Sequence, residues 1–159
     1  MKTINNWLDE YGESHKNPTN KAVHWICVPL IFFSVVGLIW EIPFPWQDLT
    51  VGGYHPNWAV ITLLLVVGYY LTLSVPIAIG MFLFGSLCLG ILYAIDNPQR
   101  GAFPIWILCI SIFVVAWIGQ FWGHKIEGKK PSFLKDLQFL MIGPAWLMSF
   151  IYRKLGIKY

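Results

Sequence analysis

Residues 58–95 read WAVITLLLVVGYYLTLSVPIAIGMFLFGSLCLGILYAI, and this stretch decides the fold. It contains no Asp, Glu, Lys or Arg, and it is about twice as long as the roughly 20 residues that a bilayer-crossing helix needs. Ser74-Val75-Pro76 lies near its middle, where proline disfavours an uninterrupted helix. The stretch therefore predicts two transmembrane helices, at about 58–74 and 76–95, joined by a tight turn.

The composition of the whole chain agrees with a membrane protein. Of its 159 residues, 57% are hydrophobic, 17% aromatic and 12% charged, whereas soluble domains carry roughly 25% charged residues. The net charge of +3 comes without a basic block interleaved with aromatic residues, so a nucleic-acid partner is not expected. Three cysteines within apolar stretches argue against a disulfide framework. We expect one integral-membrane domain that spans residues 1–159.

Further uncharged stretches predict the remaining helices. Residues 22–40 and 102–123 are each long enough to cross a bilayer. Residues 137–152 are shorter and contain Gly143-Pro144, which favours an interfacial or re-entrant helix over a fifth crossing. The sequence thus predicts an all-α polytopic membrane protein with four transmembrane helices and a C-terminal interfacial or re-entrant helix.

The distribution of Lys and Arg predicts the orientation. With four crossings, ten of the eleven basic residues fall on the side of the two termini, and only Arg100 falls on the other side. Cytoplasmic loops carry the excess of Lys and Arg, so both termini are expected in the cytoplasm. This topology suits either a bacterial inner membrane or the endoplasmic reticulum.

The same topology divides the four histidines. His15, His24 and His124 fall near the cytoplasmic interface, whereas His55 falls on the opposite side. Three imidazoles at one depth are enough for a metal site with open positions, and neutral imidazole suits iron, zinc, copper or nickel. The alternative is that each histidine is an ordinary hydrogen-bonded residue of the membrane interface.

Polar residues at helical spacing accompany two of these histidines. Asn20 precedes His24 by four residues, Gln120 precedes His124 by four, and Glu127 follows His124 by three. On a helix such pairs share a face, and polar partners of this kind orient a ligating imidazole. For Gln120, an interhelical hydrogen bond is an equally good explanation.

Tyr11 and Asn17 flank His15 and are candidates for the same supporting role. A structural alternative also exists: Asn17 would form an Asx-turn before Pro18, and Asn20 would cap the first transmembrane helix.

Lys125, Lys129 and Lys130 lie at the cytoplasmic mouth and are weak candidates for binding a carboxylate or phosphate. The excess of basic residues on the cytoplasmic side already explains the presence of these lysines. Sequence patterns of other chemistries, such as HExxH and GxSxG, do not occur in the chain.

Two segments carry a resemblance to a known family. The first is YGESHKNPTNKAVH at residues 11–24, followed by Pro29. The second is QFWGHKIEGKKP at residues 120–131, followed by Leu137-Gln138 and Gly143-Pro144. In this order and spacing they resemble the Mpo-type 2-hydroxy fatty acid dioxygenases, a family of small membrane proteins long described as a domain of unknown function.

This resemblance implies an Fe(II)-dependent enzyme that uses O2 to convert 2-hydroxy fatty acids, by α-oxidation, to acids one carbon shorter. It implies His15, His24 and His124 as the iron ligands, with Glu127 as a further ligand or as a partner that orients one. A 2-hydroxy acid can chelate a metal through its carboxylate and hydroxyl oxygens, and membrane lipids would surround the chain. The alternatives are another metal-dependent lipid enzyme, such as a zinc hydrolase, and a non-catalytic membrane scaffold.

Overall fold

The computed structural model describes residues 2–46, 55–96, 104–128 and 139–159, and in these ranges the regular structure is entirely helical. The helices are α1 (Ile4–Gly12), α2 (Pro18–Trp40), α3 (Trp58–Leu73), α4 (Val75–Ile95), α5 (Ile105–Glu127) and α7 (Ile142–Leu155).

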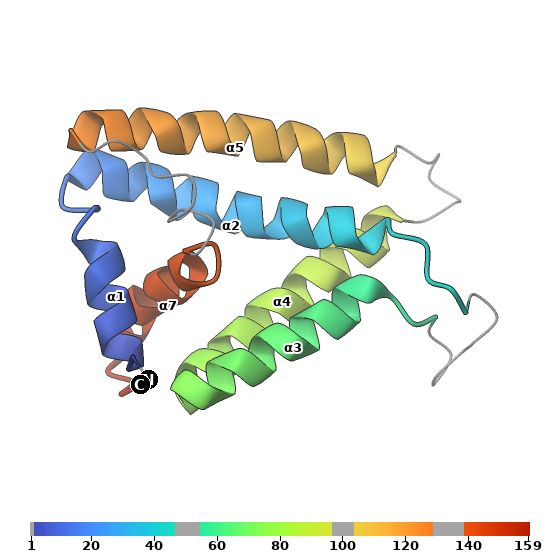
Figure 1. Ribbon diagram of the computed structural model, residues 1–159, viewed down its shortest axis with the longest axis horizontal. Coiled ribbons are helices and arrows are strands. Elements are labelled where there is room, and N and C mark those ends of the chain that lie inside the picture. The colour runs from blue at the N-terminus through green and yellow to red at the C-terminus, as the bar shows by residue number, and fades with distance from the viewer. Residues whose placement is uncertain (1, 47–54, 97–103, 129–138) are drawn as a thin grey trace.

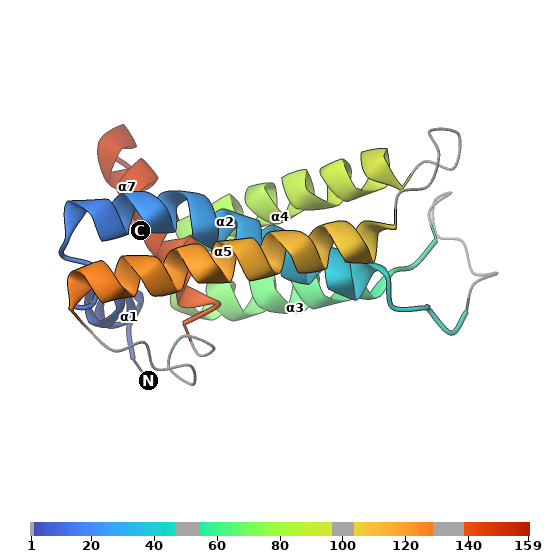
Figure 2. The ribbon, with the colours of Figure 1, turned by 90° about the horizontal axis from the view of Figure 1, so that it is seen from above.

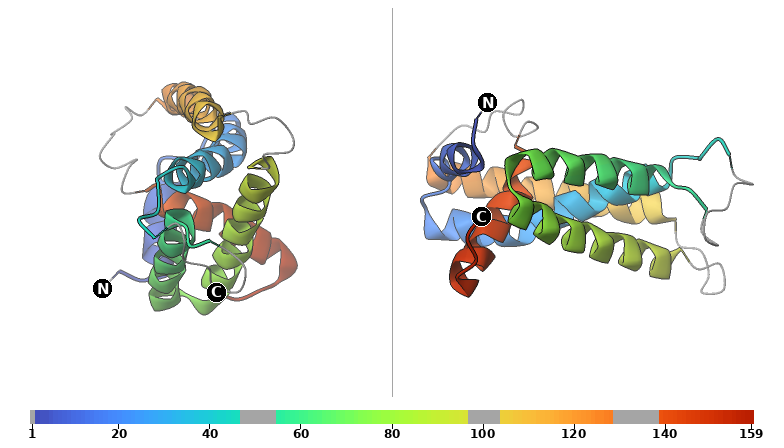
Figure 3. Two further views of the ribbon diagram at one scale, coloured as in Figure 1. Left: turned by 90° about the vertical axis from the view of Figure 1, so that its right-hand side faces the viewer. Right: turned by 90° about the horizontal axis from the view of Figure 1, so that it is seen from below.

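The helices α2, α3, α4 and α5 run back and forth between the two ends of the molecule, with α3 and α4 inclined to α2 and α5 (Figure 1). α5 lies beside α2 and runs antiparallel to it, and α3 and α4 form an antiparallel pair on the other side of α2 (Figures 1 and 3). α1 and α7 lie across the end of the bundle where α2 begins and α5 ends, and both chain termini lie at this same end (Figure 2). This end, called the terminal end below, carries the candidate site.

Three of these helices, α2, α4 and α5, are long and apolar enough to cross a membrane. α3 is equally apolar but has only 16 residues. The predicted break between α3 and α4 is present, because Ser74 adopts an extended conformation and its hydroxyl accepts a hydrogen bond from the Ile77 N–H. Large side chains such as Leu65 and Val115 project outward with about 70% of their surface exposed, as expected for a lipid-facing surface.

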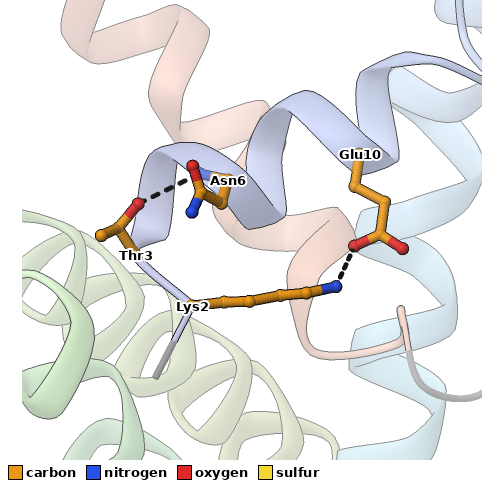
Figure 4. Close-up of polar contacts among 4 residues, drawn as sticks. All are labelled: Lys2, Thr3, Asn6 and Glu10. Atoms are coloured by element: carbon orange, nitrogen blue, oxygen red, sulfur yellow. Dashed lines mark hydrogen bonds and ion pairs between the residues drawn. The ribbon is translucent and has the colours of Figure 1, made fainter.

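The short helix α1 was not predicted from the sequence. Thr3 caps it by accepting a hydrogen bond from the Asn6 N–H, and Lys2 pairs with Glu10 at 2.7 Å (Figure 4). Ile4, Leu8 and Tyr11 follow helical spacing and are buried. This buried face holds α1 against α7 and so places Tyr11 at the candidate site.

The C-terminal helix begins at Ile142, later than the predicted residue 137, although residues 137 and 138 lie outside the described part of the chain. Gly143-Pro144 does not interrupt it, since proline is tolerated in the first turn of a helix. α7 packs against α1, α2 and α4, and the Tyr152 hydroxyl donates a hydrogen bond of 2.6 Å to the Pro76 carbonyl.

α2 and α5 approach each other closely because glycines line their contact. A methyl group at Gly119 would lie 2.7 Å from the Cys27 sulfur, and one at Gly123 would collide with the Asn20 side-chain oxygen. Glycines four residues apart allow such close helix contact in membranes. The contact brings the first turns of α2 beside the last turns of α5.

Candidate metal centre

Three buried histidines meet at the terminal end of the bundle. His15 lies in the turn between α1 and α2, His24 in the second turn of α2, and His124 in the last turn of α5. Their side chains are only 3%, 0% and 5% exposed. One ring nitrogen from each lies within 4.8 Å of the other two, so a single ion could contact all three after small side-chain movements.

Backbone carbonyls set the tautomers of two of these rings. His15 Nδ1 lies 2.6 Å from the Tyr11 carbonyl oxygen, and His24 Nδ1 lies 2.9 Å from the Asn20 carbonyl oxygen. A carbonyl can only accept, so each Nδ1 must carry the proton, and each Nε2 then presents a lone pair. This arrangement is typical of metal-ligating histidines.

The His24 ring also provides a direct test of whether a metal fits. Its Nε2 is buried and has no hydrogen-bond partner. Burying such an acceptor unsatisfied costs about 1–3 kcal/mol. A metal ion beside Nε2 would satisfy it, and His15 and His124 stand at the right place to complete the ligand set.

Aromatic side chains from α1 and α7 pack against His15. The Tyr11 ring stacks on His15, with ring centroids 4.2 Å apart and an angle of 13° between the planes. Trp146 packs against both rings, at 5.2 Å from Tyr11 and 5.3 Å from His15. Sequence reasoning missed Trp146, although its position two residues after Gly143-Pro144 could have drawn attention to it.

The sequence matches the family model for 2-hydroxy-palmitic acid dioxygenase Mpo1-like proteins over residues 1–155. The chain belongs to the Mpo1-like family. It is also 29% identical over 151 residues to the 2-hydroxy-palmitic acid dioxygenase MPO1 of Saccharomyces cerevisiae, a match covering 94% of this chain and 79% of the yeast protein. No solved structure matches the chain. The resemblance carried by the two histidine-containing segments is therefore confirmed at the level of the family.

In this Mpo1-like chain, Glu127 connects α5 to the turn that carries His15. Its carboxylate accepts hydrogen bonds from the N–H groups of Lys16 at 2.8 Å and Asn17 at 2.9 Å, and from the Asn20 side-chain amide at 3.0 Å. Among the described residues, the group with converging ligand atoms consists of the three histidines alone. These hydrogen bonds thus join the last turn of α5 to the turn that carries His15.

The asparagines act mainly through the backbone. Asn17 is the N-cap of α2 and accepts hydrogen bonds from the N–H groups of Thr19 and Asn20, with Pro18 in the first helical position. The structural alternative in which Asn20 caps this helix is therefore wrong. Instead, the Asn20 carbonyl orients His24, and the Asn20 amide donates to Ser14 and Glu127.

The other candidate residues lie further from the centre. Gln120 makes no hydrogen bond to His124 and instead lines a pocket beside the centre. Lys125 is exposed, and Lys129 and Lys130 lie outside the described residues. His55 is exposed and precedes α3 at the opposite end of the bundle, away from the other three histidines.

Proposed function

We propose that this protein is a 2-hydroxy fatty acid dioxygenase that binds Fe(II) through His15, His24 and His124 and shortens its substrate by one carbon with O2. Membership of the Mpo1-like family supports the reaction class. The observation that carries the proposal is the convergence of three buried imidazoles, two of which have Nδ1 bound to a backbone carbonyl.

When bound, Fe(II) would supply the redox chemistry with O2 that amino-acid side chains cannot supply. Because only three residues would hold the ion, it would remain accessible to a 2-hydroxy acid and O2. Because imidazole ligands are neutral, they leave the charge of the metal to attract the substrate carboxylate. Tyr11 and Trp146 exclude water from one side, and Glu127 holds the His15 turn in place.

The proposed reaction balances without an external reductant. A 2-hydroxy acid, RCH(OH)COOH, and O2 give RCOOH, CO2 and water. The bond between C1 and C2 breaks, and the substrate itself supplies the electrons that reduce O2. A compact chain that binds one metal and one amphiphile is therefore sufficient for this chemistry.

We also propose four membrane crossings with both termini in the cytoplasm. The alternating direction of α2, α3, α4 and α5 supports this topology, as does the position of both termini at one end (Figure 1). The candidate centre would then face the cytoplasmic interface, where the carboxylate of a fatty acid resides. The accessibility of a cysteine introduced at His55 to a membrane-impermeant thiol reagent tests the orientation: labelling from the non-cytoplasmic side agrees with it, and labelling only from the cytoplasm contradicts it.

Oxygen uptake tests the proposed reaction. Iron-loaded protein should consume O2 with 2-hydroxypalmitic acid, but not with palmitic acid, and should release the fifteen-carbon acid. His24→Ala should abolish uptake, whereas His55→Ala should retain it, because His55 is exposed at the other end. If the iron-loaded protein consumes no O2 with 2-hydroxy acids of several chain lengths, the proposal is wrong. Zinc-dependent ester cleavage would then indicate a hydrolase.

A further inference from the structure

A small pocket adjoins the candidate metal centre on the side of the bundle interior. Its walls come from Val28 and Ile31 of α2, from Trp117 and Gln120 of α5, and from Phe139, Leu140, Gly143 and Pro144. The α2 and α5 positions lie one and two turns beyond the histidine of the same helix, away from the terminal end. The pocket therefore continues the centre into the apolar space between α2 and α5.

Tyr11 is a wall shared by the pocket and the metal centre. Its ring stacks on His15, and the same residue lines the pocket. The cavity volume of about 20 Å³ exceeds the roughly 10–15 Å³ that one water molecule needs. The pocket can thus hold one group of the size of a hydroxyl, in a cavity that shares Tyr11 with the metal centre.

Gln120 contributes a largely buried side-chain amide to this pocket. Its side chain is only 8% exposed, and its amide makes no hydrogen bond to another residue in the described part of the chain. A primary amide presents both donors and an acceptor, and burying it without partners is unfavourable. Most of the other wall residues are apolar, so a ligand group that both donates and accepts would complete the site.

We propose that Gln120 binds the 2-hydroxyl group of the substrate and thereby selects 2-hydroxy acids over unsubstituted fatty acids. A hydroxyl matches the amide because it also donates and accepts one hydrogen bond each. An unsubstituted acid would leave the buried amide unpaired, and sites of this kind reject analogues that lack the hydrogen-bonding group. This inference rests on the proposed function.

Affinity measurements on Gln120→Leu test the inference independently of turnover. Zinc-loaded protein, which should not turn over, is titrated with 2-hydroxypalmitic acid and with palmitic acid, and the ratio of the two dissociation constants is compared with that of the unaltered chain. We expect Gln120→Leu to reduce the preference for the hydroxy acid about tenfold or more, the usual range for losing one buried hydrogen bond. Metal content should stay unchanged.

The controls separate this inference from the proposed function. Ser111→Ala, an exposed change on the same helix, should keep the full preference. An unchanged ratio in Gln120→Leu, or an equal loss of affinity for both acids, would overturn the role of Gln120. Loss of metal from Gln120→Leu would also overturn it, since Gln120 would then support the centre itself. Failure of the unaltered iron-loaded chain to oxidise any 2-hydroxy acid is a different result and refutes the proposed function.

Discussion

Glu127 is expected to keep the His15 turn closed, and Glu127→Gln tests this role with little change in size. The carboxylate accepts hydrogen bonds from three donors, at 2.8 Å from the Lys16 N–H, 2.9 Å from the Asn17 N–H and 3.0 Å from the Asn20 amide. A neutral amide presents only one oxygen, so either the Lys16 N–H or the Asn20 amide loses its acceptor and faces an NH2 group instead, and the bonds that remain lose the negative charge. At roughly 1.5–3 kcal/mol for a hydrogen bond to a charged group, the loss amounts to at most about 3 kcal/mol.

The loss of hydrogen bonding weakens metal binding by allowing the His15 turn to open in the metal-free protein. If the turn opens in some of the metal-free molecules, only the molecules with a closed turn can bind metal. The apparent affinity then equals the affinity of the closed form multiplied by the fraction of molecules that are closed. Since each 1.4 kcal/mol corresponds to a factor of ten, the 3 kcal/mol sets an upper limit of roughly 100-fold. We therefore expect Glu127→Gln to bind metal about 10–100-fold more weakly, a range typical of residues that orient ligands.

Competition against a chelator of known affinity measures this effect, with Glu10→Gln as the matched control. Glu10 lies on α1 and pairs with Lys2 on the surface, so its replacement should leave metal affinity unchanged. Wild-type affinity in Glu127→Gln would refute the positioning role. A loss as complete as in His124→Ala would instead make Glu127 a metal ligand.

Two further substitutions address the packing around the centre. Gly123→Ala should lower both the melting temperature and metal occupancy, because the added methyl group collides with Asn20, whose carbonyl orients His24. The control is Gly90→Ala, on α4 with open space around it, which should leave metal occupancy unchanged and should not lower the melting temperature, since Ala favours a helix over Gly. Trp146→Ala should destabilise the protein by about 3–5 kcal/mol, as measured by denaturant unfolding in detergent, because it removes a buried indole that covers Tyr11 and His15. A change of less than about 1 kcal/mol for Trp146→Ala would contradict this packing role.

The long helices could be predicted from the sequence because the membrane imposes simple rules on it. Uncharged stretches indicated α2, α4 and α5, and Ser74-Val75-Pro76 indicated the end of α3. The asymmetry of Lys and Arg placed His15, His24 and His124 at one depth. Depth alone could not show that the rings touch, because contact depends on the close packing of α2 on α5 at Gly119 and Gly123.

Contacts between distant parts of the chain explain what sequence reasoning missed. Glu127 bonds to residues more than 100 positions away, which helical spacing from His124 could not indicate. The polar N-terminal segment concealed α1, whose apolar side is visible only at Ile4, Leu8 and Tyr11. Trp146 covers the centre because α7 crosses the end of the bundle, a direction that its sequence does not specify.

The metal content of the purified chain tests the central claim most directly. Mass spectrometry of protein purified without a polyhistidine tag, after anaerobic iron loading, should give about one iron per chain. The single variants His15→Ala, His24→Ala and His124→Ala should each lose it, and His55→Ala should keep it. Metal retained in all four variants, or absent from the unaltered chain, would contradict a shared centre at these three histidines.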